Sequence, residues 1–279
     1  MKLGIFAKAF HGPTPQAVLA AARDAGYAAV QYNMACSGLA ALPLEIPGDI
    51  AAAVAQASDE TGVEIAAVSA TYNMIHPDAV VRTKGRGGFQ AIASVARRMG
   101  THLLTVCSGT RDPADQWRHH PDNATPAAWL ELCAEFSRIV PIAEASDLVI
   151  GVEPELNNVV CTAERARQLI DTLGSPRIRV VFDPANLFET ESPEVRRRII
   201  ARAVDLLGDR IALAHAKDRR PDGQFAAAGH GVIDFAHYLT VLRRAGFGGV
   251  LVTHGLAAAE AGRVAAFLRS QLLASEGPE

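Results

Sequence analysis

The chain alternates between short apolar runs and longer amphipathic stretches from its first residues to its last. The apolar runs are rich in Val, Ile, Leu and Ala and are nearly continuous, which is typical of strands buried on both faces of a parallel sheet. The pattern predicts eight strands, at 2–6, 28–33, 64–70, 102–107, 148–153, 179–183, 211–216 and 250–254.

The stretches between these strands carry helix-start and helix-stop signals. TPQAVLAAARDAG begins at Thr14 with Pro15 in the first helical position, and TAERARQLIDTLG begins at Thr162, has Glu164 in its first turn and closes at Gly174. Hydroxyl caps, an early proline and a terminal glycine are the usual boundaries of a helix. Repeated strand–helix units imply parallel strand pairing with right-handed crossovers.

Eight such units predict a closed (β/α)8 TIM barrel, with residues 1–279 as a single domain and 275–279 as a frayed tail. The length of 279 residues fits one barrel of this kind. The structural alternative is an open doubly wound sheet. That alternative is disfavoured because the glycine-rich dinucleotide motif does not follow the first strand.

Four of the predicted strands end on a side chain that a buried strand does not normally carry. The runs LVIGVEPE, RIRVVFDPAN, RIALAHAKD and GVLVTHG place Glu153, Asp183, His215 and His254 at or near their carboxyl ends. Each residue alone has a structural explanation, as a turn or cap acid or as a core histidine. Because the carboxyl ends of barrel strands share one face, we expect the four to meet and to bind a divalent metal.

The ligand types constrain the predicted metal. Two carboxylates with two imidazoles suit Mn²⁺, Zn²⁺, Co²⁺ or Fe²⁺ better than Mg²⁺, which prefers a shell of oxygens. Four protein ligands also leave coordination positions for water or substrate. The predicted cofactor is therefore a divalent ion, with Mn²⁺, Zn²⁺ and Co²⁺ preferred.

Composition excludes several other classes of partner. The formal net charge is −3, and long runs of Lys or Arg are absent, which argues against nucleic acid as the main partner. The apolar run in MKLGIFAKAF is too short for a signal peptide, and none reaches the length of a membrane span. We expect a cytoplasmic protein with no membrane partner, whose four unpaired cysteines are reduced.

The motifs VEPE, FDPAN and HAKD, with the GFGGVLV approach to the last strand, resemble the xylose isomerase-like TIM-barrel superfamily of sugar phosphate isomerases and epimerases. The resemblance covers essentially the whole chain and is weaker in its first half. It implies a metal that holds hydroxyl and carbonyl oxygens of a keto sugar, and carboxylates that move a proton through a metal-bound enediolate.

The same resemblance implies that Glu153 is both ligand and acid/base. Glu155, two residues on and on the same side of an extended backbone, is a second base candidate. The chain departs from the family at two positions. His254 stands where many members have glutamate, and the segment Asp183-Pro-Ala-Asn186 has asparagine where many members have the histidine of an Asp-x-x-His motif. A histidine can bind metal and move protons, so His254 is a third catalytic candidate.

The motifs and these departures leave several functions open. The leading prediction is a sugar isomerase or epimerase. A metal-dependent lyase or dehydratase of a keto-sugar or keto-inositol is the alternative, because it needs one base where epimerisation uses two opposed carboxylates. An endonuclease IV-like DNA-repair nuclease and a non-catalytic barrel are further alternatives. The predicted partner is a small sugar or sugar acid, and a homo-oligomer stays open.

A long irregular stretch, SGTRDPADQWRHHPDNATP, follows the fourth strand. Loops of this length are usually functional or disordered, so we expect either a lid over the barrel mouth or a passive surface loop. Arg219 and Arg220 are read either as an anion-binding pair or as solvated surface residues. The predicted substrate-binding residues are His76, Arg111, Trp117, Arg118, His120, Asn186 and Lys217.

Overall fold

A computed structural model describes residues 1–275. Eight parallel strands form a closed ring in which β1 pairs with both β2 and β9, and β6 pairs with β7. The predicted closed barrel is therefore confirmed, and the open sheet is not formed. The ring strands are β1 (Lys2–Phe6), β2 (Ala29–Tyr32), β3 (Glu64–Ser69), β4 (Leu103–Cys107), β5 (Val149–Glu153), β6 (Ile178–Phe182), β7 (Ile211–Arg219) and β9 (Val250–Thr253), and β8 (Phe225–Ala227) lies outside the ring.

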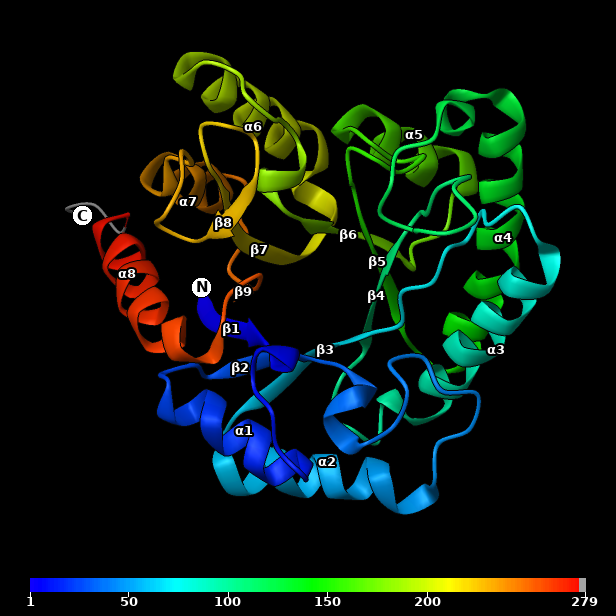
Figure 1. The fold of residues 1–279 in the computed structure, drawn as a ribbon, viewed down its shortest axis with the longest axis horizontal. Helices are drawn as coiled ribbons and strands as arrows, with labels where there is room; N and C mark the ends of the chain where they lie inside the picture. The colour runs from blue at the N-terminus through cyan, green and yellow to red at the C-terminus, as the bar shows by residue number, and fades with distance from the viewer. Residues whose placement is uncertain (276–279) are drawn as a thin grey trace.

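Eight α-helices of the described chain surround this ring and follow one another around it in chain order (Figure 1). Short 3₁₀ turns, among them η2 (Met34–Ser37), η3 (Pro121–Ala124) and η4 (Pro184–Asn186), lie in the loops. The helices are α1 (Pro15–Asp24), α2 (Gly48–Thr61), α3 (Ala79–Ala96), α4 (Pro126–Ala145), α5 (Ala163–Leu173), α6 (Pro193–Leu207), α7 (Phe235–Arg244) and α8 (Ala261–Ala274).

The helix boundaries follow the local chemistry of the chain. Thr14 caps α1 by accepting a hydrogen bond from the backbone of Ala17 at 3.2 Å, and Thr162 caps α5 in the same way. Gly174 ends α5 with φ of 62°, a left-handed conformation that glycine adopts without steric cost. The predicted starts of both helices and the predicted end of α5 are thus confirmed.

Apolar side chains form two separate layers. The inner layer fills the barrel and includes Ala67, Leu103, Val181, Leu213 and Val252. The larger outer layer lies between the strands and the helices. Because each strand buries both faces, its sequence is nearly continuously apolar, and a polar side chain is left mainly where a strand reaches the rim.

The structure differs from the predicted strands at β7. This strand does not end at 216 but continues to Arg219, because residues 217–219 pair antiparallel with β8, which lies outside the ring. Lys217 is opposite Ala227, and Arg219 is opposite Phe225. Because the residues of this extension are charged, the hydrophobic pattern does not predict that the strand continues. The hairpin brings Lys217, Arg219 and Phe225 to the rim of the barrel.

Ser275 belonged to the predicted frayed tail, yet it is hydrogen-bonded to the end of α8 through Gln271 and Leu272. The rest of that tail, 276–279, lies outside the described residues. Among the helices of residues 1–275, none combines the length and the apolar character needed to cross a membrane.

Candidate metal centre

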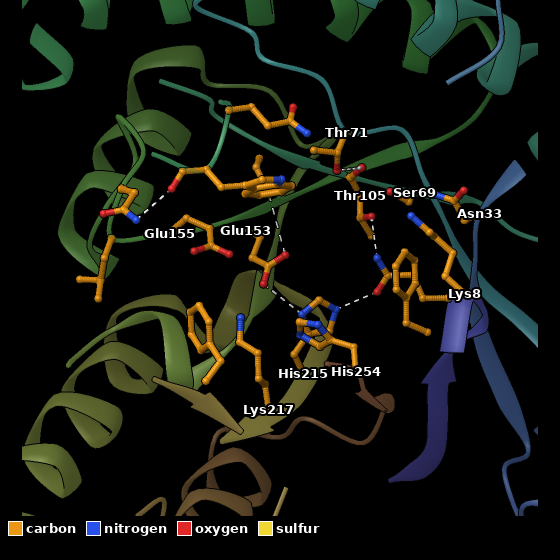
Figure 2. A pocket seen from close by; sticks show the side chains of 18 of the residues that line it. Lys8, Asn33, Ser69, Thr71, Thr105, Glu153, Glu155, His215, Lys217 and His254 are labelled. Carbon is orange, nitrogen blue, oxygen red and sulfur yellow. Dashed lines mark hydrogen bonds and ion pairs between the residues drawn. The ribbon is translucent and has the colours of Figure 1, made fainter. Parts of the chain in front are cut away.

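The four predicted ligands come together at the carboxyl end of the barrel. Glu153 is the last residue of β5, Asp183 and His254 directly follow β6 and β9, and His215 lies within β7. One ligand atom from each lies within 4.8 Å of all the others. Figure 2 shows Glu153, His215 and His254 pointing toward the same space. The cluster could therefore hold a metal ion.

Direct contacts join the four side chains. His215 Nδ1 lies 3.0 Å from Glu153 Oε1 and 3.8 Å from Asp183 Oδ2. His254 Nε2 lies 3.1 Å from the same Asp183 oxygen. The two imidazole rings are 4.5 Å apart between centroids. Nitrogen and carboxylate oxygen atoms thus converge on one small volume, as a mixed-ligand site requires.

Asp183 serves the local fold and the cluster at once. Its Oδ1 accepts a hydrogen bond from the backbone of Ala185 at 2.9 Å and so caps η4. Its Oδ2 is left to face both histidines and Lys217, whose Nζ is 3.4 Å away. The turn-capping role that the FDPAN motif suggests therefore positions the ligand oxygen rather than competing with it.

The charges of the cluster are strongly linked. Burial alone would raise the carboxyl pKa values, but Lys217 and the histidines hold the pKa of Asp183 well below its usual range, and His215 lowers that of Glu153. Burial opposes charge on His215, yet Glu153 and Asp183 raise its pKa to about 9. Burial and the neighbouring His215 lower the pKa of His254. Two anionic carboxylates thus face one cationic and one neutral imidazole.

A second hydrogen-bonded layer fixes the His215 ring. Its Nε2 donates to Gln31 Oε1 at 2.7 Å, and Gln31 in turn donates to the Thr105 hydroxyl at 3.0 Å. Gln31 comes from β2 and Thr105 from β4, and both are buried. Keeping the proton on Nε2 leaves Nδ1 for the metal side, which is the usual arrangement around a ligating histidine.

Asn186 links the cluster to Glu155 and Lys217. Its amide nitrogen donates to Glu153 at 2.9 Å and to Glu155 at 2.8 Å, while its oxygen accepts from Lys217 Nζ at 2.7 Å. These contacts satisfy Asn186 within the protein, where it is fully buried. Burial and the charge of Glu153 raise the pKa of Glu155 to about 8. A carboxyl poised near neutral pH is therefore held beside the cluster.

A cavity of about 690 Å³ opens above the cluster. Glu153, His215 and His254 line its base, together with Glu155 and Lys217 (Figure 2). Of the predicted substrate-binding residues, Lys217 and Trp117 line this cavity. Its wall also contains residues that the sequence did not single out, namely Lys8, Gln31, Thr105, Cys107, Gln116, Asn157, Gln224 and Phe225.

The remaining predicted substrate residues are placed elsewhere. His76 lines an adjacent hollow and contacts the backbone oxygen of Pro113 at 3.1 Å. Arg111 is ion-paired with Glu131, and Arg118 pairs with Asp112 at 3.2 Å. His120 accepts a hydrogen bond from the backbone of Asp122 and caps η3. These side chains stabilise the long loop, and only Trp117 from the predicted lid residues reaches the central cavity.

Arg219 and Arg220 are not equivalent. Arg219 is 6% exposed, donates to the backbone oxygens of Ala185 and Gly223, and lines the cavity, whereas Arg220 is exposed. The reading of both as a solvated surface pair is therefore wrong for Arg219. The hairpin explains the difference, because Arg219 is the last residue of β7 and pairs with Phe225, whereas Arg220 lies beyond the end of the strand.

Fold and cluster together define a class of protein: a (β/α)8 barrel with a possible metal site at the carboxyl ends of its strands. Residues 19–271 match the model of the xylose isomerase-like TIM barrel family. The chain belongs to that family, as its motifs predicted. A search of curated proteins found no significant match.

Solved structures with the same fold include several sugar epimerases. The apo crystal structure of 3-keto-D-glucoside 4-epimerase YcjR from E. coli is 16% identical, with a TM-score of 0.77 over 97% of this chain and 99% of that chain. L-ribulose 3-epimerase is 16% identical, with a TM-score of 0.76 over 99% and 95%. The IOLI protein with a bound zinc atom is 17% identical, with a TM-score of 0.73 over the whole of both chains. At these identities the likeness shows the fold.

Proposed function

We propose that this protein is a divalent-metal-dependent enzyme that moves a proton at the carbon beside the carbonyl of a sugar or sugar-derived acid, as an isomerase or epimerase. The observation that carries the proposal is the convergence of Glu153, Asp183, His215 and His254 within 4.8 Å at the base of a cavity, beside a carboxyl that titrates near neutral pH. The sugar epimerases among its structural neighbours support an enzyme of this kind.

The donor set fits a metal ion. Both carboxyl groups are held anionic, and His254 is neutral. Gln31 accepts a hydrogen bond from His215 Nε2, so the proton on Nδ1 is the one that a cation can replace. The nitrogen and oxygen donors favour Mn²⁺, Zn²⁺ or Co²⁺ over Mg²⁺. When bound, such a cation would polarise a carbonyl and stabilise the negative charge that develops when the neighbouring proton leaves.

The protein's own groups would carry the proton. Glu155, with a pKa of about 8, can accept and return a proton near neutral pH, and Asn186 holds it at 2.8 Å. Lys217 supplies a fixed positive charge at the cavity wall, because burial would lower its pKa but Asp183 and Glu155 raise it. That charge would favour an anionic reaction intermediate.

One observation favours chemistry with a single base. His254 occupies the end of β9, where a second carboxylate would have to stand for two-sided epimerisation, and it contacts Asp183 at 3.1 Å. Isomerisation needs one base, and so does β-elimination of a hydroxyl by a lyase or dehydratase. We therefore keep the lyase as the second candidate function, sharing the same first proton transfer.

Exchange of the substrate proton with solvent tests the proposal. Metal-loaded protein in D₂O is incubated with a panel of ketoses and keto acids, and loss of the proton beside the carbonyl is followed by NMR. We expect exchange with at least one compound, and a loss of at least about 100-fold in both Glu153→Gln and His215→Ala. Glu144→Gln, an exposed residue of α4, is the matched control. Undiminished exchange in both cluster variants would contradict the mechanism.

A further inference from the structure

The exposed aromatic side chains of the described chain gather at one place. Seven large hydrophobic side chains are exposed, and the two aromatic ones, Trp117 at 47% and Phe225 at 48%, both line the central cavity. The others are aliphatic, and none lines that cavity: Leu44, Val80, Val81, Leu130 and Leu273. An aromatic ring left in water forgoes a large gain from burial, so two such rings in one cavity suit a ligand that covers them.

The Phe225 ring and the Trp117 backbone are held in place by their surroundings. Phe225 lies opposite Arg219 in the hairpin, and its ring centroid is 4.2 Å from the Arg219 guanidinium carbon and 3.7 Å from Lys217 Nζ. Trp117 is fixed through its backbone, which donates to Asp115 at 2.9 Å and accepts from Asn157 at 2.9 Å. A pre-formed aromatic surface binds a ligand without first being ordered.

The hairpin itself is rigidly anchored. The buried carboxylate of Asp218 accepts backbone hydrogen bonds from Arg219, Gly229, Gly231 and Ile233 at 2.8 to 3.1 Å. These bonds tie the loop after β8 back to β7. Phe225 is therefore presented to the cavity by a fixed element.

Amide side chains accompany the two rings. Gln116 precedes Trp117, Gln224 precedes Phe225, and Asn157 lies on the loop after β5; all three line the same cavity. Aromatic rings suit the C–H face of a hydroxylated ring, while amides can donate to and accept from its hydroxyl groups. This combination of lining residues is the chemistry of a second sugar ring.

The size of the cavity agrees with such a ligand. Its volume of about 690 Å³ lies within the range of sites that enclose drug-sized molecules. The metal cluster and Glu155 account only for its base. A single keto sugar held at the cluster would fill only part of this volume.

We propose that the substrate is a glycoside whose reacting sugar lies at the cluster and whose second pyranose ring is covered by Trp117 and Phe225. The assignment of the reacting sugar rests on the proposed function. The aromatic subsite does not, because it is formed entirely by residues outside the cluster and should bind its ring in metal-free protein as well.

Ligand-observed NMR titrations test the subsite with three probes: methyl β-D-glucoside, cellobiose and 4-nitrophenyl β-D-glucoside. Cellobiose should bind about two- to tenfold more tightly than the methyl glucoside for each ring that contacts it. Phe225→Leu and Trp117→Leu should each reduce this preference by the share of one ring, the double variant should abolish it, and Phe225→Tyr should keep it. Trp129→Phe, which alters the half-buried tryptophan of α4, is the matched control and should keep the preference.

Three results would overturn the proposal. The first is equal binding of cellobiose and the methyl glucoside, and the second is a preference that is undiminished in both Phe225→Leu and Trp117→Leu. The third is a preference shown by the nitrophenyl glucoside alone, which would assign the subsite to an aryl ring. Titrations with metal-loaded and chelator-treated protein separate this inference from the proposed function. A preference for cellobiose without any proton exchange would support the aromatic subsite alone. Proton exchange on free ketoses without a preference for cellobiose would support only the proposed function.

Discussion

Replacing Gln31 by leucine tests whether the second layer around His215 prepares it to bind metal. The change removes the acceptor 2.7 Å from His215 Nε2 and the donor 3.0 Å from the Thr105 hydroxyl, both in buried surroundings. Loss of such an outer partner typically weakens metal binding about 10- to 100-fold. At about 1.4 kcal/mol per factor of ten, this corresponds to roughly 1.4–2.8 kcal/mol.

The metal-free protein should also lose stability. An unpaired buried donor costs about 1–3 kcal/mol, so unfolding of Gln31→Leu by urea without metal should show a loss of that size. Gln31→Glu keeps an acceptor for Nε2 and should retain metal affinity. Gln56→Leu on α2, where the exposed side chain donates to Glu60 at 2.6 Å, is the matched control.

The assay is competition for Zn²⁺ between chelator-treated protein and a chromophoric chelator, at fixed pH and ionic strength. We expect the dissociation constant to rise about 10- to 100-fold in Gln31→Leu and to stay within threefold in the Gln31→Glu and Gln56→Leu variants. An unchanged constant in Gln31→Leu would refute the reasoning that the Gln31 contact sets the His215 tautomer for metal binding.

Two further predictions concern stability. The pKa of Glu155 is about 8 in the folded protein and near 4.3 in the unfolded chain, so this group makes the metal-free protein less stable as pH rises through that window. Glu155→Gln should remove this loss, and equal urea midpoints of the unsubstituted protein at pH 5 and pH 8.5 would contradict the prediction. A Cβ at Gly231 would lie 2.1 Å from the Arg219 backbone oxygen and 2.4 Å from Asp218 Oδ1, so Gly231→Ala should cost about 1–3 kcal/mol by urea unfolding. Gly262→Ala, in open space on α8, is its control, and equal stability of the two variants would contradict the predicted clash.

The fold was predictable because the strands and connections of a barrel have a recognisable sequence pattern. Strands buried on both faces are continuously apolar, and their connections carry cap residues such as Thr14 and Thr162. The β7–β8 hairpin was not predictable in this way. The β7 side of the hairpin is charged, and Lys217 and Arg219 are buried through an ion pair and backbone contacts that a hydrophobic pattern does not record.

The cluster was predictable, whereas its surroundings were only partly so. The four ligand candidates end apolar runs that share one face, so their meeting follows from topology. Gln31 and Thr105 lie inside apolar strands far apart in the chain, and only the closed ring brings them to His215. Arg111 and Arg118 form ion pairs with Glu131 and Asp112, contacts within and around the loop that its composition alone does not reveal.

The metal content of the purified protein, measured by elemental analysis before and after chelation, tests the central claim most directly. We expect about one Mn, Zn or Co per chain from the cluster, and the chelator should remove it. Metal binding should be weakened in His254→Ala and retained in His254→Glu, where a carboxylate replaces the imidazole as ligand. Protein that contains no metal and takes up none on addition would contradict the metal-dependent mechanism and leave the barrel as its only confirmed part.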